Sequence, residues 1–170
     1  VLNGLWLVLA QFATLPLTVA GIVLLLIALC ITFRRTVVEP GRGFLDSILI
    51  DGATGLHLGW VSLATVANIT AWLTAEGPAS WADAGPVLAV VVLIVVGLIG
   101  VAIAVLSGWR VAPGLAIAWG LSWIAVGRVQ GDPLSPGVGV TAGIVAIVVL
   151  AVPIVGTFAH RAIEMRNAEA

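Results

Sequence analysis

The feature that most constrains this chain is its series of apolar runs, each about 20 residues long and separated by short breaks. An α-helix needs a run of that length to cross about 30 Å of hydrocarbon. Of the 170 residues, 61% are hydrophobic and 9% are charged, which leaves too little polar surface for a water-soluble domain. We therefore expect an all-α fold, a polytopic transmembrane helical bundle.

Hydropathy and helix-breaking residues together predict six membrane segments, of which the first is too short for a complete span. The segments are expected at residues 1–13, 15–33, 53–75, 86–107, 111–127 and 138–160. Because the first segment is short and the chain starts at Val1, we expect further residues upstream. Pro153 lies inside the last apolar run and predicts a bend in that helix.

The arginine residues predict how the chain is oriented in the membrane, because basic residues collect on cytoplasmic loops. Six of the seven lie in the stretch 34–51, in the turn 108–112 or in the C-terminal tail: Arg34, Arg35, Arg42, Arg110, Arg161 and Arg166. We expect these six, and the C-terminus, on the cytoplasmic side. The stretch 34–51 is expected to be an amphipathic helix on the inner surface or a solvated connector, with Asp46 and Asp51 as exposed carboxylates.

Several classes of function lack support in this sequence. The net charge of −1 provides no basic surface for nucleic acid. A lone cysteine, Cys30, excludes a disulfide framework or a cysteine metal site. His57 and His160 are expected on opposite sides of the membrane, which disfavours a bis-histidine haem site. No phosphate-binding loop, zinc-protease helix or nucleophile elbow occurs, so we expect a protein that is not an enzyme.

The third segment carries the most distinctive pattern, because Trp60, Ala64 and Asn68 recur at intervals of four residues and Thr65 adjoins them. An amide in the middle of a membrane helix costs free energy unless it finds hydrogen-bond partners. One hypothesis is that this stripe packs against a neighbouring helix. The other is that it forms a pocket wall, with indole surface for a planar apolar ligand and hydrogen bonds from Thr65 and Asn68.

At these residues the sequence resembles the tryptophan-rich sensory protein/translocator protein (TspO/MBR) family. The stretch G-W-V-S-L-A-T-V-A-N-I-T-A-W is similar to the last helix of that family, and the matching positions are Trp60, Ala64, Thr65, Asn68 and Trp72. The opening L-N-G-L-W-L-V-L-A-Q-F resembles the third helix of the family, at positions Asn3, Trp6 and Phe12. The family's W-x-P-P-containing first helix has no counterpart, and animal members' cholesterol motif needs a tyrosine that this chain lacks.

The resemblance covers residues 1–75 and predicts two parts, TspO-like helices at 1–75 and three additional transmembrane helices with a short cytoplasmic tail at 76–170. It is closest to a longer bacterial branch of the family, which implies a bacterial cytoplasmic membrane. The family implies a helical pocket for a tetrapyrrole or another hydrophobic planar ligand, with a sensory, transport or regulatory role. The ligand-binding residues are then expected to be Trp6, Trp60, Ala64, Thr65 and Asn68.

The resemblance implies no required cofactor, and a porphyrin or haem would be bound as a ligand. The expected partners are the lipid bilayer and a hydrophobic small molecule, with a homodimer or a larger membrane complex left open. The alternative function is a non-catalytic accessory subunit that docks through its small-residue faces. A secondary transporter ranks third, since no pair of broken helices marks two halves. Trp119 and Trp123 are expected to anchor or pack their helix.

Overall fold

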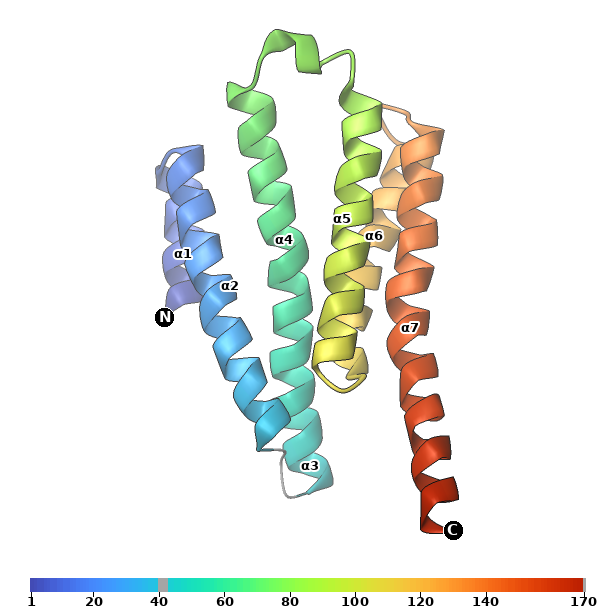
Figure 1. Ribbon diagram of the computed structural model, residues 1–170. Helices are drawn as coiled ribbons and strands as arrows, with labels where there is room; N and C mark the ends of the chain where they lie inside the picture. The colour runs from blue at the N-terminus through green and yellow to red at the C-terminus, as the bar shows by residue number, and fades with distance from the viewer. Residues whose placement is uncertain (40–42, 170) are drawn as a thin grey trace.

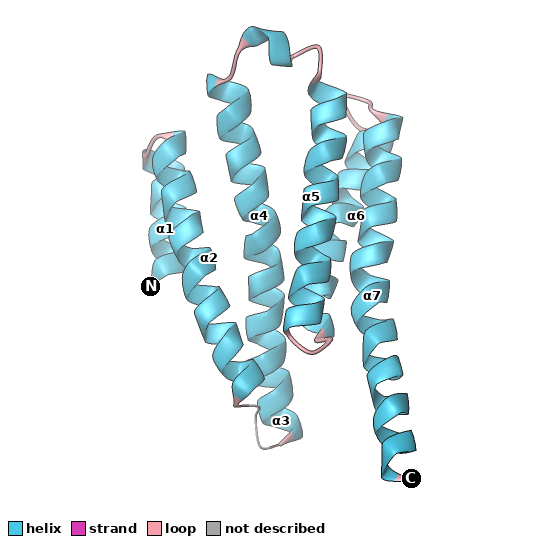
Figure 2. Cartoon of the chain, in the orientation of Figure 1, coloured by secondary structure: helices cyan, strands magenta, loops and turns pink. Residues whose placement is uncertain are grey.

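The computed structural model describes residues 1–39 and 43–169, and every regular element in them is helical (Figures 1 and 2). The membrane helices are α1 (Leu2–Phe12), α2 (Leu15–Val38), α4 (Ala53–Glu76), α5 (Gly85–Leu106), α6 (Val111–Gln130) and α7 (Pro136–Ala168). Short elements complete the fold, namely α3 (Phe44–Asp46), the π-helical turn η1 (Ser47–Gly52) and the 3-10 turn η2 (Ala79–Trp81).

Among the described residues, five helical segments are long and apolar enough to cross a membrane, and α1, with 11 residues, is shorter. The all-α transmembrane bundle and the incomplete first segment are therefore confirmed. The protein is an integral membrane protein. Pro153 lies within α7, where its ring is buried against α6, and the expected bend stays a prediction.

The stretch 34–51 differs from both expectations for it. Helix α2 continues to Val38, and α3, η1 and α4 form one helical segment that runs from Phe44 to Glu76. Residues 44–51 therefore continue into α4 through the π-helical turn η1, and Gly52 has helical dihedral angles and does not end the segment. Arg42 lies outside the described residues.

Successive long helices run in opposite directions, which places the end of α2, the α5–α6 turn and the end of α7 at one end of the bundle (Figure 1). The five described arginine residues that were expected to share a side lie at this end: Arg34, Arg35, Arg110, Arg161 and Arg166. Whether this end is cytoplasmic stays a prediction. The prediction that His57 and His160 lie on opposite sides of the membrane was wrong, because α4 begins and α7 ends at this same end of the bundle.

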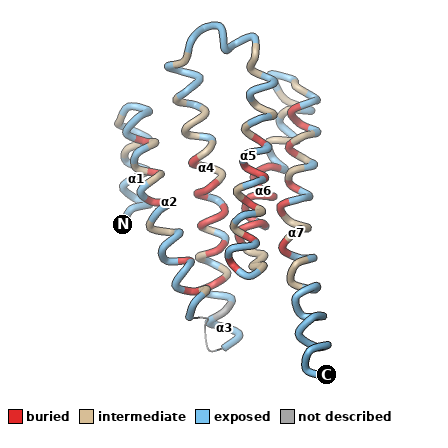
Figure 3. Tube along the Cα trace, viewed as in Figure 1, coloured by how far each residue is buried: buried red, intermediate tan, exposed pale blue. Residues whose placement is uncertain are grey.

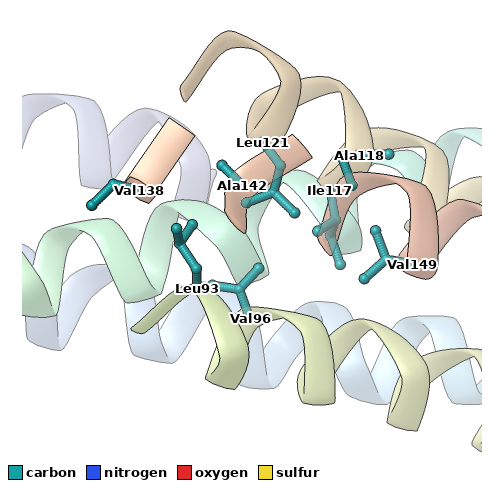
Figure 4. Packing of buried hydrophobic residues seen from close by; sticks show 9 residues of the cluster. Leu93, Val96, Ile117, Ala118, Leu121, Val138, Ala142 and Val149 are labelled. Carbon is teal, nitrogen blue, oxygen red and sulfur yellow. The ribbon is translucent and has the colours of Figure 1, made fainter. Parts of the chain in front are cut away.

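The densest packing joins α5, α6 and α7 (Figure 4). Ile117 and Leu121 of α6 and Val149 of α7 have no exposed surface. Buried residues lie on the sides of the helices that face one another, and exposed residues lie outside (Figure 3). On α5 the exposed side is apolar, with Val91 and Ile94 among its residues, as a helix facing lipid requires.

Glycine residues let the backbone of α6 come into contact with α4 and with α7. A Cβ atom on Gly59 of α4 would overlap the carbonyl group of Pro113 on α6. A Cβ atom on Gly114 would lie 2.5 Å from the carbonyl oxygen of Val149 on α7. Close approach of this kind is what allows helices to associate in lipid, where burial of apolar surface gives them no advantage.

We expect Gly59→Ala to destabilise the bundle by about 2 kcal/mol or more, because α4 and α6 must separate to admit the methyl group. The matched control is Gly127→Ala, since a Cβ atom on this α6 glycine meets nothing within 4 Å. The free energy of unfolding, measured by dodecyl sulfate titration with circular dichroism, should fall only for Gly59→Ala. Equal stability of the two variants would contradict the backbone contact.

At the arginine-rich end, one side chain joins three helical segments. Arg110 precedes α6, and its guanidinium lies 3.0 Å from a carboxylate oxygen of Asp51 in η1. It also donates a 2.8 Å hydrogen bond to the Thr36 carbonyl of α2 and lies over the Phe33 ring, 5.8 Å from its centroid. Asp51 is therefore buried, which corrects its expected exposure, whereas Asp46 is exposed.

We expect Arg110→Gln to lower the free energy of unfolding by about 2–4 kcal/mol, because it leaves the buried Asp51 carboxylate without this cation. The double variant Arg110→Met/Asp51→Leu should recover part of the loss, since it removes both charges together. Arg166→Gln in the exposed tail is the control and should have no effect. The same titration measures all three, and an unchanged Arg110→Gln protein would contradict a role for the ion pair in stability.

Candidate functional site

The predicted stripe on α4 is spread around the helix rather than confined to one side. The Trp60 side chain is 53% exposed, whereas Thr65 is 5% exposed and is buried in the bundle. Five residues rotate a helix by about 140°, which accounts for the difference. Ala64 and Asn68 are half-buried at intermediate positions. Trp60, Ala64 and Asn68 therefore follow the partly exposed side of α4, and Thr65 faces the protein.

Hydrogen bonds within α4 satisfy donors of the two polar members of the stripe. The Asn68 side-chain amide donates to the Ala64 carbonyl at 2.8 Å, and the Thr65 hydroxyl donates to the Val61 carbonyl at 2.7 Å. The packing hypothesis expects Asn68 to hydrogen-bond to a neighbouring helix, but its amide nitrogen bonds within α4 instead. The Asn68 amide, on a partly exposed surface, thus has a hydrogen-bond acceptor within its own helix.

Trp6 lies beside the stripe on the side of α1 and α2. Together with Ala64 it packs against a cluster formed by Ile22 and Leu25 of α2 and Val61 of α4. Its indole Nε1 is buried and has no acceptor among the described residues. The structure therefore brings Trp6 and Ala64 together, as a shared site requires, and leaves the indole N–H of Trp6 without an acceptor there.

Trp60 borders a groove between α4 and α6, which we call the α4/α6 groove. It has a volume of about 530 Å³ and is lined by Leu56, His57, Trp60, Leu115, Ala116 and Trp119. The lining surface is almost entirely apolar, and the groove is open to the outside of the bundle. Trp119 was expected only to anchor or pack. Trp119 follows Leu115 and Ala116 at intervals of four and three residues, which indicates that the three share one side of α6. Nothing in the sequence indicates that this side faces Trp60.

A second hollow lies at the opposite end of the bundle from Arg110, and we call it the Arg128 hollow. It has a volume of about 700 Å³ and is formed by the last turns of α4, the connector that contains η2, the first turns of α5 and the α6–α7 connection. Arg128, Trp81, Thr70 and Ser135 are among its lining residues. None of the five predicted site residues lines it, because it is formed at the end of α4 beyond Asn68.

A family model described as TSPO-like protein matches residues 1–155. The chain belongs to the TSPO-like protein family. This match confirms the resemblance, and it extends beyond residue 75 through α5, α6 and most of α7. Searches of curated proteins and of solved structures gave no match. The division of this TSPO-like chain at residue 75, and the ligand-binding roles of the five predicted residues, stay predictions.

We expect Asn68→Leu to fold as well as the unsubstituted TSPO-like protein, with less than about 0.5 kcal/mol lost, because its amide donates only within α4. Thr65→Leu is the matched comparison one turn away, and it should cost about 1–3 kcal/mol by overpacking a buried position. Unfolding titrations compare the two variants. A loss for Asn68→Leu as large as that for Thr65→Leu would instead assign Asn68 to helix packing.

Proposed function

We propose that this TSPO-like membrane protein binds a hydrophobic planar ligand from the bilayer, and that a tetrapyrrole such as protoporphyrin or haem is its first candidate. The observation that carries the proposal is the α4/α6 groove, whose walls include the indoles of Trp60 and Trp119. Indole rings offer flat apolar surface to a planar ligand. Membership of the TSPO-like family supports a binding role in a sensory, transport or regulatory process.

The position of the groove fits a ligand that arrives through lipid. Trp60 and Trp119 are both more than half exposed on the outside of the bundle, where the protein meets acyl chains. An apolar ligand can enter this groove without crossing the tightly packed α5–α6–α7 core. Lateral entry from the bilayer is therefore part of the proposal, and the C-terminus on the cytoplasmic side completes its orientation.

In this proposal two of the other predicted residues offer surface to the ligand, and two act on it indirectly. Ala64 and Asn68 follow Trp60 along the partly exposed side of α4, and they extend the surface available to a ligand wider than the groove. Trp6 packs against the cluster between α2 and α4, and Thr65 is buried and hydrogen-bonded within α4, so both act on the ligand through the position of α4. Binding proceeds without covalent chemistry and needs no resident cofactor.

We expect Trp119→Leu to weaken protoporphyrin binding about tenfold, because it removes one aromatic wall of the groove. The matched control is Trp123→Leu, since Trp123 is on the same helix and is 60% exposed, against 61% for Trp119, but does not line the groove. Titration of the full chain in detergent, followed by the Soret absorption of the porphyrin, avoids the loss of indole fluorescence in these variants.

Equal binding by the Trp119→Leu and Trp123→Leu proteins would contradict the groove as the site. Weak, unsaturable binding by the unsubstituted protein would overturn the tetrapyrrole proposal. The accessory-subunit alternative would then gain support if a defined membrane partner purified with the protein in mild detergent and Gly-to-Leu substitutions on its exposed faces released that partner.

A further inference from the structure

The Arg128 hollow combines a cation with apolar walls, and we propose that it binds an amphipathic anion with an acyl chain. The headgroup, a phosphate or a carboxylate, pairs with the Arg128 guanidinium, and the chain lies against α5. This site is separate from the α4/α6 groove, because the two share no lining residue. The inference therefore stands independently of the tetrapyrrole proposal.

The charge of the hollow is positive and is not neutralised by the protein. Arg128 is half-buried, and within the described part of the chain it makes no ion pair; its one hydrogen bond reaches the Pro133 carbonyl at 3.4 Å. The acidic residues near this end, Glu76, Asp83 and Asp132, are exposed, and none of them lines the hollow. A guanidinium held this way binds a phosphate or carboxylate through paired N–H donors.

The rest of the hollow suits an acyl chain. Most of its lining surface is apolar, with Leu88, Val91 and Val92 of α5 and Leu73 of α4 among the contributors. Its volume of about 700 Å³ lies within the range of about 300–1,000 Å³ that is usual for small-molecule sites. The indole of Trp81 lies on the connector above this surface, at a position where tryptophan meets lipid headgroups.

Helix ends also border the hollow. Gly85 and Pro86 at the start of α5, and Ser135 at the start of α7, line the hollow. Neither helix has a side-chain cap or an acidic residue in its first turn. The C-terminal ends of α4 and α6 border the same hollow, so the dipoles of the four helices oppose one another and the Arg128 guanidinium supplies the positive charge.

The depth of the hollow in the membrane points to a lipid as its occupant. It lies where α4 ends and α5 begins, between apolar helix and polar connector, as the boundary between acyl chains and headgroups does. A lipid at that depth places its charged group at Arg128 and its chain along α5 without leaving the bilayer. Phospholipid and free fatty acid share this chemistry, and the experiment separates them.

The test uses the full chain in neutral detergent and native mass spectrometry to count bound lipid. Phosphatidylglycerol is compared with phosphatidylcholine of the same acyl chains, and oleate is compared with methyl oleate. We expect either phosphatidylglycerol or oleate to bind at least about tenfold more tightly than its matched lipid, phosphatidylcholine or methyl oleate. The anion that shows this preference identifies the source of the ligand. Arg128→Gln should remove that preference, and Arg161→Gln in the exposed tail should retain it.

A second variant gives an independent result in case Arg128→Gln does not fold. Ala82 is an exposed connector residue that lines the hollow, so Ala82→Phe fills the hollow and should displace the chain while Arg128 is kept. Equal retention of anion and neutral lipid, or an anion preference that survives both substitutions, would overturn the proposal. Loss of protoporphyrin binding in Trp119→Leu with lipid binding intact would show that the two sites are distinct.

Discussion

The fold depends on backbone contact in a solvent that does not drive apolar surfaces together. In lipid, leucine and valine gain little by leaving the acyl chains, so helices associate where small residues let their backbones meet. Here α6 has that role, because Gly59 admits it against α4 and Gly114 admits it against α7. The buried Ile117 and Leu121 then fill the space that these contacts define.

The same contacts explain where binding surfaces can exist. Gly59 fixes α4 against α6 one residue before Trp60, so the indole must lie outside the contact, where Trp119 of α6 also lies. The Arg128 hollow occurs where the helices end and connectors replace close packing. Arg110 closes the opposite end by joining α2, η1 and α6. One end of the bundle is thus held by an ion pair, and the other is left open around Arg128, which forms no ion pair with any residue that the structure describes.

Apolar run length was enough to predict the all-α membrane bundle and the short first segment, and the motif around Trp60 and Asn68 was enough to identify the family, because both are local properties of the sequence. Long-range pairs were not predictable. Asp51 is buried because Arg110, 59 positions later in the chain, reaches it, and nothing near Asp51 in the sequence signals that contact. The wrong placement of His57 relative to His160 had another cause, because the predicted segments alone were enough to avoid it: four long helices, an even number, return the chain to the end at which α4 begins. The stripe on α4 placed Trp60 correctly on an accessible surface, but its partner Trp119 belongs to another helix.

Helix α7 has 33 residues and is about 50 Å long, whereas the hydrocarbon of a bilayer is about 30 Å thick. Its residues from Phe158 to Ala168 are all exposed, and His160 Nε2 lies 3.2 Å from a carboxylate oxygen of Glu164 one turn later. The last turns of α7 therefore extend beyond the other helices of the bundle as a single helix (Figure 1). A fluorophore or fusion partner attached near Ala168 would be held at a distance from the rest of the bundle set by the rise of a helix, with far less spread in position than on a flexible linker.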